Sequence, residues 1–335
     1  MSESCSADSP AEIAVPQSGR TPDLVAVAII LLGAIMFSSK AIMVKLAMQH
    51  GVEPVALLLL RLVFAAPFYL VVLGWKKATA TEPLGVRANW FSLVSLGFVG
   101  YYLASYLDFV GLCYVSASLE RVILYSFPTL VLLIGAVFLN RPIRLQQVIA
   151  IALCYGGIII AVGFGEGTQS TANQWFGAAL VFLSALCYAI YVVGSGKLIP
   201  KIGVWVFTSC AMIVSTVCIV AHHLLTSPSI ELFQLPKIVY AYAAAMAFLA
   251  TVVPSFLISE GIRRIGASNA SIIGGIGPIS TIILAVIFLG ETFTIAQAVG
   301  TAFVIAGVLY ISLKKQRDRS GVKENVIRSE PCRRE

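Results

Sequence analysis

Charged residues are scarce in this chain. Only 12% of its 335 residues are Asp, Glu, Lys or Arg, whereas soluble domains carry about 25%. Hydrophobic residues make up 59% of the chain, which is more apolar surface than one core of this length can bury. The composition excludes an ordinary soluble enzyme and indicates that lipid surrounds much of the protein.

Several chemical motifs are also missing. The seven cysteines form no CxxC pair and no Cys/His ligand spacing, so we expect neither a metal nor another cofactor. No GxxxxGK[ST] loop is present, which disfavours direct coupling to ATP. The three histidines, His50, His222 and His223, fall near the ends of apolar runs. They give no acid/base group at one depth, as an intramembrane enzyme would need.

Apolar runs long enough to cross a bilayer occur ten times. A hydrocarbon core about 30 Å thick requires about 20 such residues. The runs cover residues 24–48, 55–75, 90–114, 117–139, 144–163, 175–196, 204–225, 238–260, 267–289 and 295–315. They predict an all-α integral membrane protein with ten transmembrane helices, between a disordered tail at 1–23 and a basic tail at 316–335.

The basic residues predict the orientation of these helices. If the amino terminus is cytoplasmic, 18 Lys and Arg residues lie in cytoplasmic segments, and only Lys237 lies in an outer loop. Cytoplasmic loops carry such an excess in membrane proteins. We therefore expect a multi-pass protein of the cell inner membrane with both termini cytoplasmic. The net charge of +7 then sets the topology, and we expect no nucleic-acid partner.

The chain resembles itself at an offset of 150 residues. The matching positions include Gly111 with Gly261, Pro128 with Pro278, and Gly157 with Gly307. The offset equals five spans, and a repeat displaced by an odd number of spans is inverted in the membrane. We expect a five-plus-five inverted repeat, with halves at 24–163 and 175–315.

Each half has a proline near the middle of the bilayer. Pro128 and Pro278 lie about eleven residues into their spans, where a proline removes a helical hydrogen bond and kinks the helix. Such residues also occur in membrane helices for packing alone. Their matching positions favour a hinge role for both.

Five ionisable residues fall in the outer half of the expected bilayer, where each costs a few kcal/mol on insertion scales. They are Lys40, Arg61, Asp108, Glu120 and Arg121. Three cations against two anions leave one positive charge for a substrate carboxylate or phosphate. Structural pairing of Asp108 with Arg61, or with Arg121, is the competing interpretation. Lys45 lies near a span end, where we expect it to snorkel to the interface.

Polar side chains near these charges complete the candidate site. Tyrosine rings can line a wet cavity, although they also fill ordinary membrane bundles. The candidate substrate-binding or coupling residues are Lys40, Arg61, Tyr102, Tyr106, Asp108, Glu120, Arg121, Tyr188 and Asn269.

Three segments carry a family resemblance. They are residues 37–67, residues 100–147, and FLGETFTIAQAVGTAFVIAGVLYI at 288–311. They resemble the two halves of an EamA-type member of the drug/metabolite transporter superfamily, over about residues 27–313. The resemblance implies ten helices in an inverted repeat, an inner-membrane carrier, and substrates such as amino acids, nucleosides or other small metabolites. The chain departs from the family pattern at Asn140 and Arg141, where Gly-Glu is usual, and at Ser38, where Trp-Gly is common.

Together these features predict a secondary active transporter, and not an enzyme, that moves a small metabolite such as an amino acid or organic anion. We expect export by alternating access, coupled to protons or to the substrate gradient, by a monomer or homodimer. An intramembrane enzyme or a receptor-like membrane sensor is the alternative from another class.

Overall fold

The computed structural model describes residues 24–80, 85–138, 145–164, 171–226, 232–274 and 276–310. The expected tails at 1–23 and 316–335 lie outside these residues. The principal elements are α1 (Leu24–Met48), α2 (Pro54–Thr79), η1 (Arg87–Asn89), α3 (Trp90–Gly97), η2 (Phe98–Leu103), α4 (Ala104–Gly111), α5 (Ala117–Leu124), α6 (Phe127–Phe138), α7 (Leu145–Gly163), α8 (Thr171–Ile202), α9 (Val204–Thr226), α11 (Lys237–Ala247), η3 (Phe248–Val252), α12 (Val253–Gly274) and α13 (Ile276–Leu289), followed by a helix at Ile295–Tyr310.

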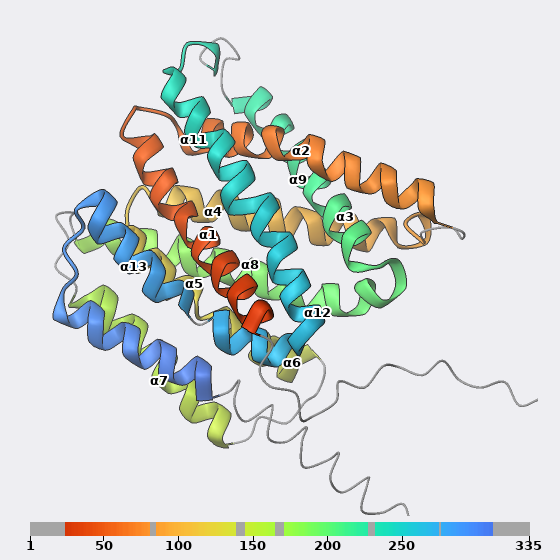
Figure 1. Ribbon diagram of the computed structural model, residues 1–335. Coiled ribbons are helices and arrows are strands. Elements are labelled where there is room, and N and C mark those ends of the chain that lie inside the picture. The colour runs from red at the N-terminus through yellow and green to blue at the C-terminus, as the bar shows by residue number, and fades with distance from the viewer. Residues whose placement is uncertain are drawn as a thin grey trace, which may run out of the picture.

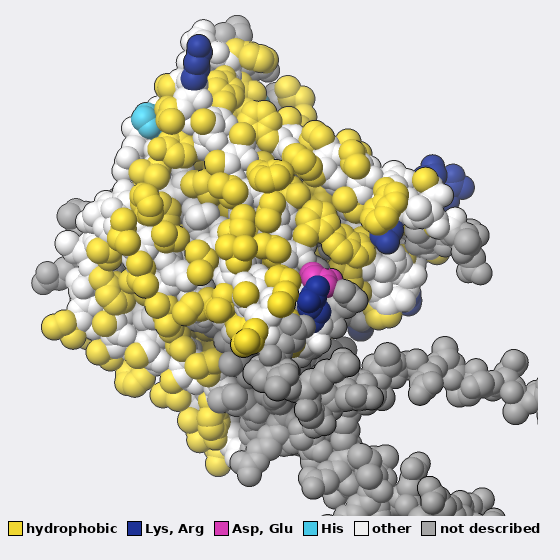
Figure 2. Space-filling model, in the orientation of Figure 1, with side chains coloured by type: hydrophobic (Ala, Val, Ile, Leu, Met, Phe, Trp, Pro, Cys, Tyr) yellow, Lys and Arg dark blue, Asp and Glu magenta, His cyan; other side chains and the backbone are white. Residues whose placement is uncertain are grey.

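The helices have the lengths and composition of membrane spans. Eight described segments are long and apolar enough to cross a bilayer, and two shorter apolar helices, Ile276–Leu289 and Ile295–Tyr310, follow them. Figure 2 shows a broad face covered by hydrophobic side chains. Val71, Ile287 and Phe138 are among the large hydrophobic residues left exposed. Since lipid is the favourable surrounding for such a face, the prediction of an all-α membrane protein is confirmed.

The bundle is organised around α1. This helix packs between α12 and α13, while α2 packs along α9, as Figure 1 shows. The helix Ile295–Tyr310 lies against α7, where Gly157 and Gly300 approach so closely that a side chain on either would meet the other's carbonyl oxygen. Small residues allow such close contact between membrane helices.

A repeat is visible in the irregular parts of the helices. The π-helical turns η2 and η3 begin at Phe98 and Phe248, which are 150 residues apart. The helix break between α5 and α6 follows Leu124, and the same offset leads to Gly274, the last described residue of α12. Interruptions of this kind at equivalent positions of two halves are a feature of secondary transporters.

The two prolines lie close to these positions. Pro128 is the second residue of α6 and Pro278 is the third residue of α13. Proline fits the first turn of a helix, where its missing N–H would have no partner. The expected span at 117–139 is thus divided into two helices next to Pro128. The hinge role of both residues stays a prediction.

Two expected cytoplasmic loops are helical. α8 continues through Lys197 and Lys201 to Ile202, and Gly203 follows in the left-handed region with φ of 80°. α12 runs through the expected loop at 261–266, where Arg264 pairs with Glu260 one turn earlier at 2.7 Å. Residues 261–266 contain two glycines but no proline, and the helix extends beyond the apolar run.

Candidate functional site

Lys40 is the centre of a buried ion cluster. Its Nζ on α1 donates a hydrogen bond of 2.5 Å to Oδ2 of Asp108 on α4, and lies 3.5 Å from Oε1 of Glu120 on α5. Lys40, Asp108 and Glu120 are 7%, 2% and 0% exposed. The two carboxylates give Lys40 the partner that a charge at this depth requires.

Arg121 is the second cation of this cluster. Its Nε lies 3.6 Å from Oε2 of Glu120, and its guanidinium lies over the ring of Phe37 on α1, 5.6 Å from the ring centroid. Lys40, Asp108, Glu120 and Arg121 therefore form a cluster with no net charge. Both contacts of Glu120 are ion pairs, and neither of its oxygens has a hydrogen bond.

Arg61 on α2 lies beside this cluster and pairs differently. Its Nε donates a hydrogen bond of 3.1 Å to Oγ1 of Thr251 in η3, and its guanidinium lies over the ring of Phe109. Asp108 acts on it electrostatically, without an ion pair among the described residues. Nη1 of Arg61 is buried and has no hydrogen-bond partner. Of the three cations Lys40, Arg61 and Arg121, only Arg61 has no ion pair with a carboxylate among the described residues.

The structure corrects the two structural pairings considered from the sequence. Asp108 forms its ion pair with Lys40, and neither Arg61 nor Arg121 takes that place. Lys40 on α1 reaches both carboxylates, since its Nζ also lies 3.5 Å from Oε1 of Glu120. The depth of a residue in the bilayer, counted along its own helix, does not show which helices are neighbours.

The tyrosines separate into two groups. Tyr102 and Tyr106 stack on one another and surround the ring of His222 on α9, whose Nδ1 lies 2.8 Å from Oη of Tyr102. Tyr188 stacks on Tyr191. Among the described residues, these tyrosines form no ring contact and no hydrogen bond with the side chains of the ion cluster. The side chain of Asn269 lies outside the described residues.

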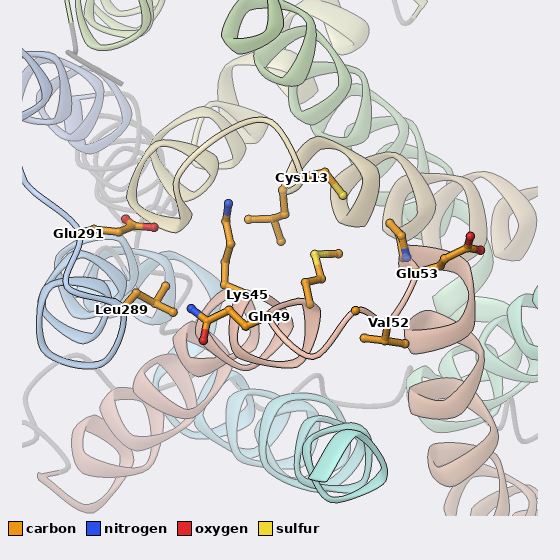
Figure 3. A pocket seen from close by; sticks show the side chains of 11 residues that line it. Lys45, Gln49, Val52, Glu53, Cys113, Leu289 and Glu291 are labelled. Atoms are coloured by element: carbon orange, nitrogen blue, oxygen red, sulfur yellow. The ribbon is translucent and has the colours of Figure 1, made fainter. Parts of the chain in front are cut away.

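A cavity of about 640 Å³ lies where α1 turns into α2 around Gly51. We call this the Gly51 end of the bundle. Figure 3 shows Lys45, Gln49, Glu53, Cys113 and Glu291 around the cavity. Partial burial raises the pKa of the Cys113 thiol, because the thiolate is poorly solvated there.

Two residues with polar contacts at the site are missing from the sequence prediction. Thr251 receives the hydrogen bond of Arg61 and donates its own to the carbonyl of Met246 within the π-helical turn. Glu291 binds the start of α5. Thr251 could have been noticed because it lies 150 residues after Tyr101, at the equivalent position of the repeat. Glu291 could not be found in this way, because it lies in a loop and its partner Ala117 is distant in the sequence.

Ten apolar helical segments among the described residues, with irregular turns repeated at one offset and charges buried between them, define a membrane protein of the secondary-transporter class. Comparison with known proteins identifies the group within that class. The chain belongs to the EamA-like transporter family, whose model matches residues 24–163 and again residues 175–313. This confirms the resemblance to the drug/metabolite transporter superfamily and makes the chain a multi-pass transporter with a small-molecule substrate.

Similar proteins carry transporter names. The chain is 33% identical to "Uncharacterized transporter YcbK" of Bacillus subtilis over 293 residues, covering 85% of this chain and 93% of that protein. It is 27% identical to "Uncharacterized transporter YyaM" of the same organism over 249 residues, covering 74% and 81%. A solved structure with 16% identity superposes with a TM-score of 0.58, covering 87% of this chain and 98% of the other, which supports the fold.

The Lys40–Asp108 pair predicts a large stability difference between single and double variants. Removing one partner of a buried pair costs about 3–5 kcal/mol, because the other charge stays buried alone. We expect Lys40→Met to lower the thermal unfolding temperature in detergent, and Lys40→Met with Asp108→Asn to recover part of the loss.

Lys45→Met is the matched control, because Lys45 lies on the same helix and no hydrogen bond or ion pair is recorded for it among the described residues. Equal unfolding temperatures for Lys40→Met and Lys45→Met would contradict the assignment.

Proposed function

We propose that this protein transports a small organic anion, such as an amino acid or another carboxylate, by alternating access and that Arg61 binds the anionic group. The observation that carries the proposal is the state of Arg61. It is 6% exposed and has one hydrogen bond, to neutral Thr251, among the described residues. A desolvated guanidinium with a free N–H is suited to a carboxylate, which it can bind in bidentate geometry.

Lys40 is not equivalent to Arg61 in this proposal. Its ammonium is held by Asp108 at 2.5 Å and by Glu120 at 3.5 Å, so a substrate anion would have to displace two carboxylates. Arg121 likewise has Glu120 as its partner. We therefore propose that Lys40 and Arg121 hold the carboxylates, while Arg61 takes the charge of the substrate.

The cavity at the Gly51 end supports a path to this position. Leu112, which lines the cavity, donates its backbone N–H to the carbonyl of Asp108 and so lies one helical turn from the cluster. Lys45, also in the cavity wall, lies on α1 above Lys40 in the same helix. An anion entering the cavity would meet Lys45 first and Arg61 deeper in the bundle.

Glu120 is the carboxyl that we propose for proton coupling. Lys40, Asp108 and Arg121 are the ionisable groups around it. The ion pairs of Glu120 are 3.5 and 3.6 Å long, so its protonation gives up weaker contacts than the 2.5 Å hydrogen bond between Lys40 and Asp108. Protonation of Glu120 would also release Lys40 and Arg121 from one of their partners.

The membrane and orientation are part of the proposal. We propose the cell inner membrane, with both termini cytoplasmic and the Gly51 end outside, on the distribution of 18 Lys and Arg residues against one. We propose export as the direction. Accumulation of the substrate in the medium of cells that overproduce the protein is expected, and accumulation inside those cells would contradict this direction.

Substitution of Arg61 tests the anion site. In proteoliposomes, we expect the wild-type protein to exchange a labelled carboxylate and Arg61→Gln to lose this exchange. Arg61→Lys should retain a small part of it, because lysine keeps the positive charge but cannot bind a carboxylate through two parallel N–H groups. Arg87→Gln is the matched control, because Arg87 lies exposed in η1. Full exchange by Arg61→Gln would overturn the assignment.

Substitution of Glu120 tests the coupling. We expect Glu120→Gln to keep substrate exchange between equal pools but to lose accumulation driven by a pH gradient, because the amide takes up no proton. Glu53→Gln removes an exposed carboxylate of the cavity wall and should accumulate substrate as the wild type does. Accumulation by Glu120→Gln that still follows the pH gradient would show that another group carries the proton.

A further inference from the structure

The Glu291 carboxylate joins the two halves of the molecule at the Gly51 end. Its Oε1 accepts a hydrogen bond of 2.7 Å from the backbone N–H of Ala117. Its Oε2 accepts the N–H of Ser118 at 3.1 Å and the Ser118 hydroxyl at 2.8 Å. Ala117 begins α5 in the first half, and Glu291 follows α13 in the second.

Charge and geometry both favour this contact. The first N–H groups of a helix have no partner within the helix, and they form the positive end of its dipole. A carboxylate satisfies them with charge-assisted hydrogen bonds, which are stronger than neutral ones. Ser116 satisfies a further N–H, that of Leu119, through its hydroxyl. The start of α5 is therefore fully capped, with Glu291 as the cap that comes from the other half.

α5 packs against α13 and α8, and to a smaller extent against α1 and α7. Its apolar residues Leu119 and Ile123 pack with Ala161 of α7 and Val181 of α8. Glu120 and Arg121 contact Lys40 and Phe37 of α1, and the start of α5 contacts Glu291 after α13. The boundary between α5 and the pair α1–α13 is thus crossed by the ion cluster and by Glu291.

The matching position in the other half has the opposite charge. At an offset of 150, Ala117 and Ser118 correspond to Ala267 and Ser268, while Glu291 corresponds to Arg141. An arginine has no hydrogen-bond acceptor on its side chain. Arg141 lies outside the described residues, while Ala267 and Ser268 lie inside α12 and not at the start of a helix, so the contact of Glu291 with a helix start is not repeated at these positions.

We propose that Glu291 is a positioning residue that latches α5 to α13 while the Gly51 end is closed and releases it when that end opens. The proposal rests on the proposed function, because opening at one end is a step of alternating access. While latched, α5 holds Glu120 and Arg121 against Lys40 and Phe37. When α5 is released, these residues separate from α1, so that opening of this end and rearrangement of the ion cluster occur together.

Pulsed electron paramagnetic resonance tests the latch without any transport assay. One spin label is placed on native Cys113, which is exposed beside the start of α5, and the other on Thr292→Cys, next to Glu291. The six other native cysteines are replaced. With Glu291 present, we expect a population at short distance and one at longer distance. Glu291→Gln should lower the share of the short-distance population.

Two further variants make this measurement specific. Ser118→Ala removes one of the three hydrogen bonds and keeps the charge of Glu291, so it should produce a smaller shift in the same direction. Glu53→Gln removes a carboxylate from the same cavity without contact to α5, and it should leave the distribution unchanged. A single distribution that is identical with and without Glu291→Gln would overturn the latch.

Cross-linking the same pair distinguishes a moving latch from a permanent structural contact. A short bis-methanethiosulfonate that joins Cys113 to Thr292→Cys should abolish exchange of the carboxylate, and reduction should restore it. Exchange at an unchanged rate in the cross-linked protein would overturn the proposal. If the wild type exchanges no anion, the proposed function fails, and the distance distributions still decide whether Glu291 acts as a latch.

Discussion

The structure depends on the cost of burying charge between membrane helices. Lys40, Asp108 and Glu120 come from α1, α4 and α5, and each is less than 9% exposed. A single one of these charges would be unfavourable within the bilayer, so each helix is stable in its position only while the other two supply partners. The cluster therefore fixes the arrangement of three helices and at the same time leaves Arg61 as an adjacent cation without a carboxylate of its own.

The second constraint is the interruption of regular helix at equivalent points of the two halves. The π-helical turns that begin at Phe98 and Phe248 occur at an offset of 150 residues. They place irregular backbone next to the charged residues, since Thr251 of η3 receives the hydrogen bond of Arg61. The fold is symmetric in these features, whereas the charges lie in the first half and are not repeated in the second. We propose that the symmetry permits rocking of the halves and that the asymmetric charges form the substrate site.

Much of the fold could be predicted from the sequence because membrane spans are determined by local composition. The run at 24–48 matches α1 at both ends, and the depth of Lys40 and Asp108 follows from counting residues along a helix. Contacts between helices could not be obtained in this way. Which cation binds Asp108 depends on the neighbours of α1, and the partner of Glu291 is 173 residues away in the chain. The tyrosines show the same limit, since sequence proximity to Asp108 does not bring Tyr102 or Tyr106 to the cluster.

The central claim is that Arg61 binds the anionic group of the substrate, and equilibrium binding to purified protein tests it most directly. A carboxylate that stabilises the wild type in a thermal unfolding assay should have no effect on Arg61→Met, and its uncharged methyl ester should stabilise neither protein. Ligand binding raises the unfolding temperature only of a protein that retains the site. Equal stabilisation of Arg61→Met and wild type by the carboxylate would contradict the account.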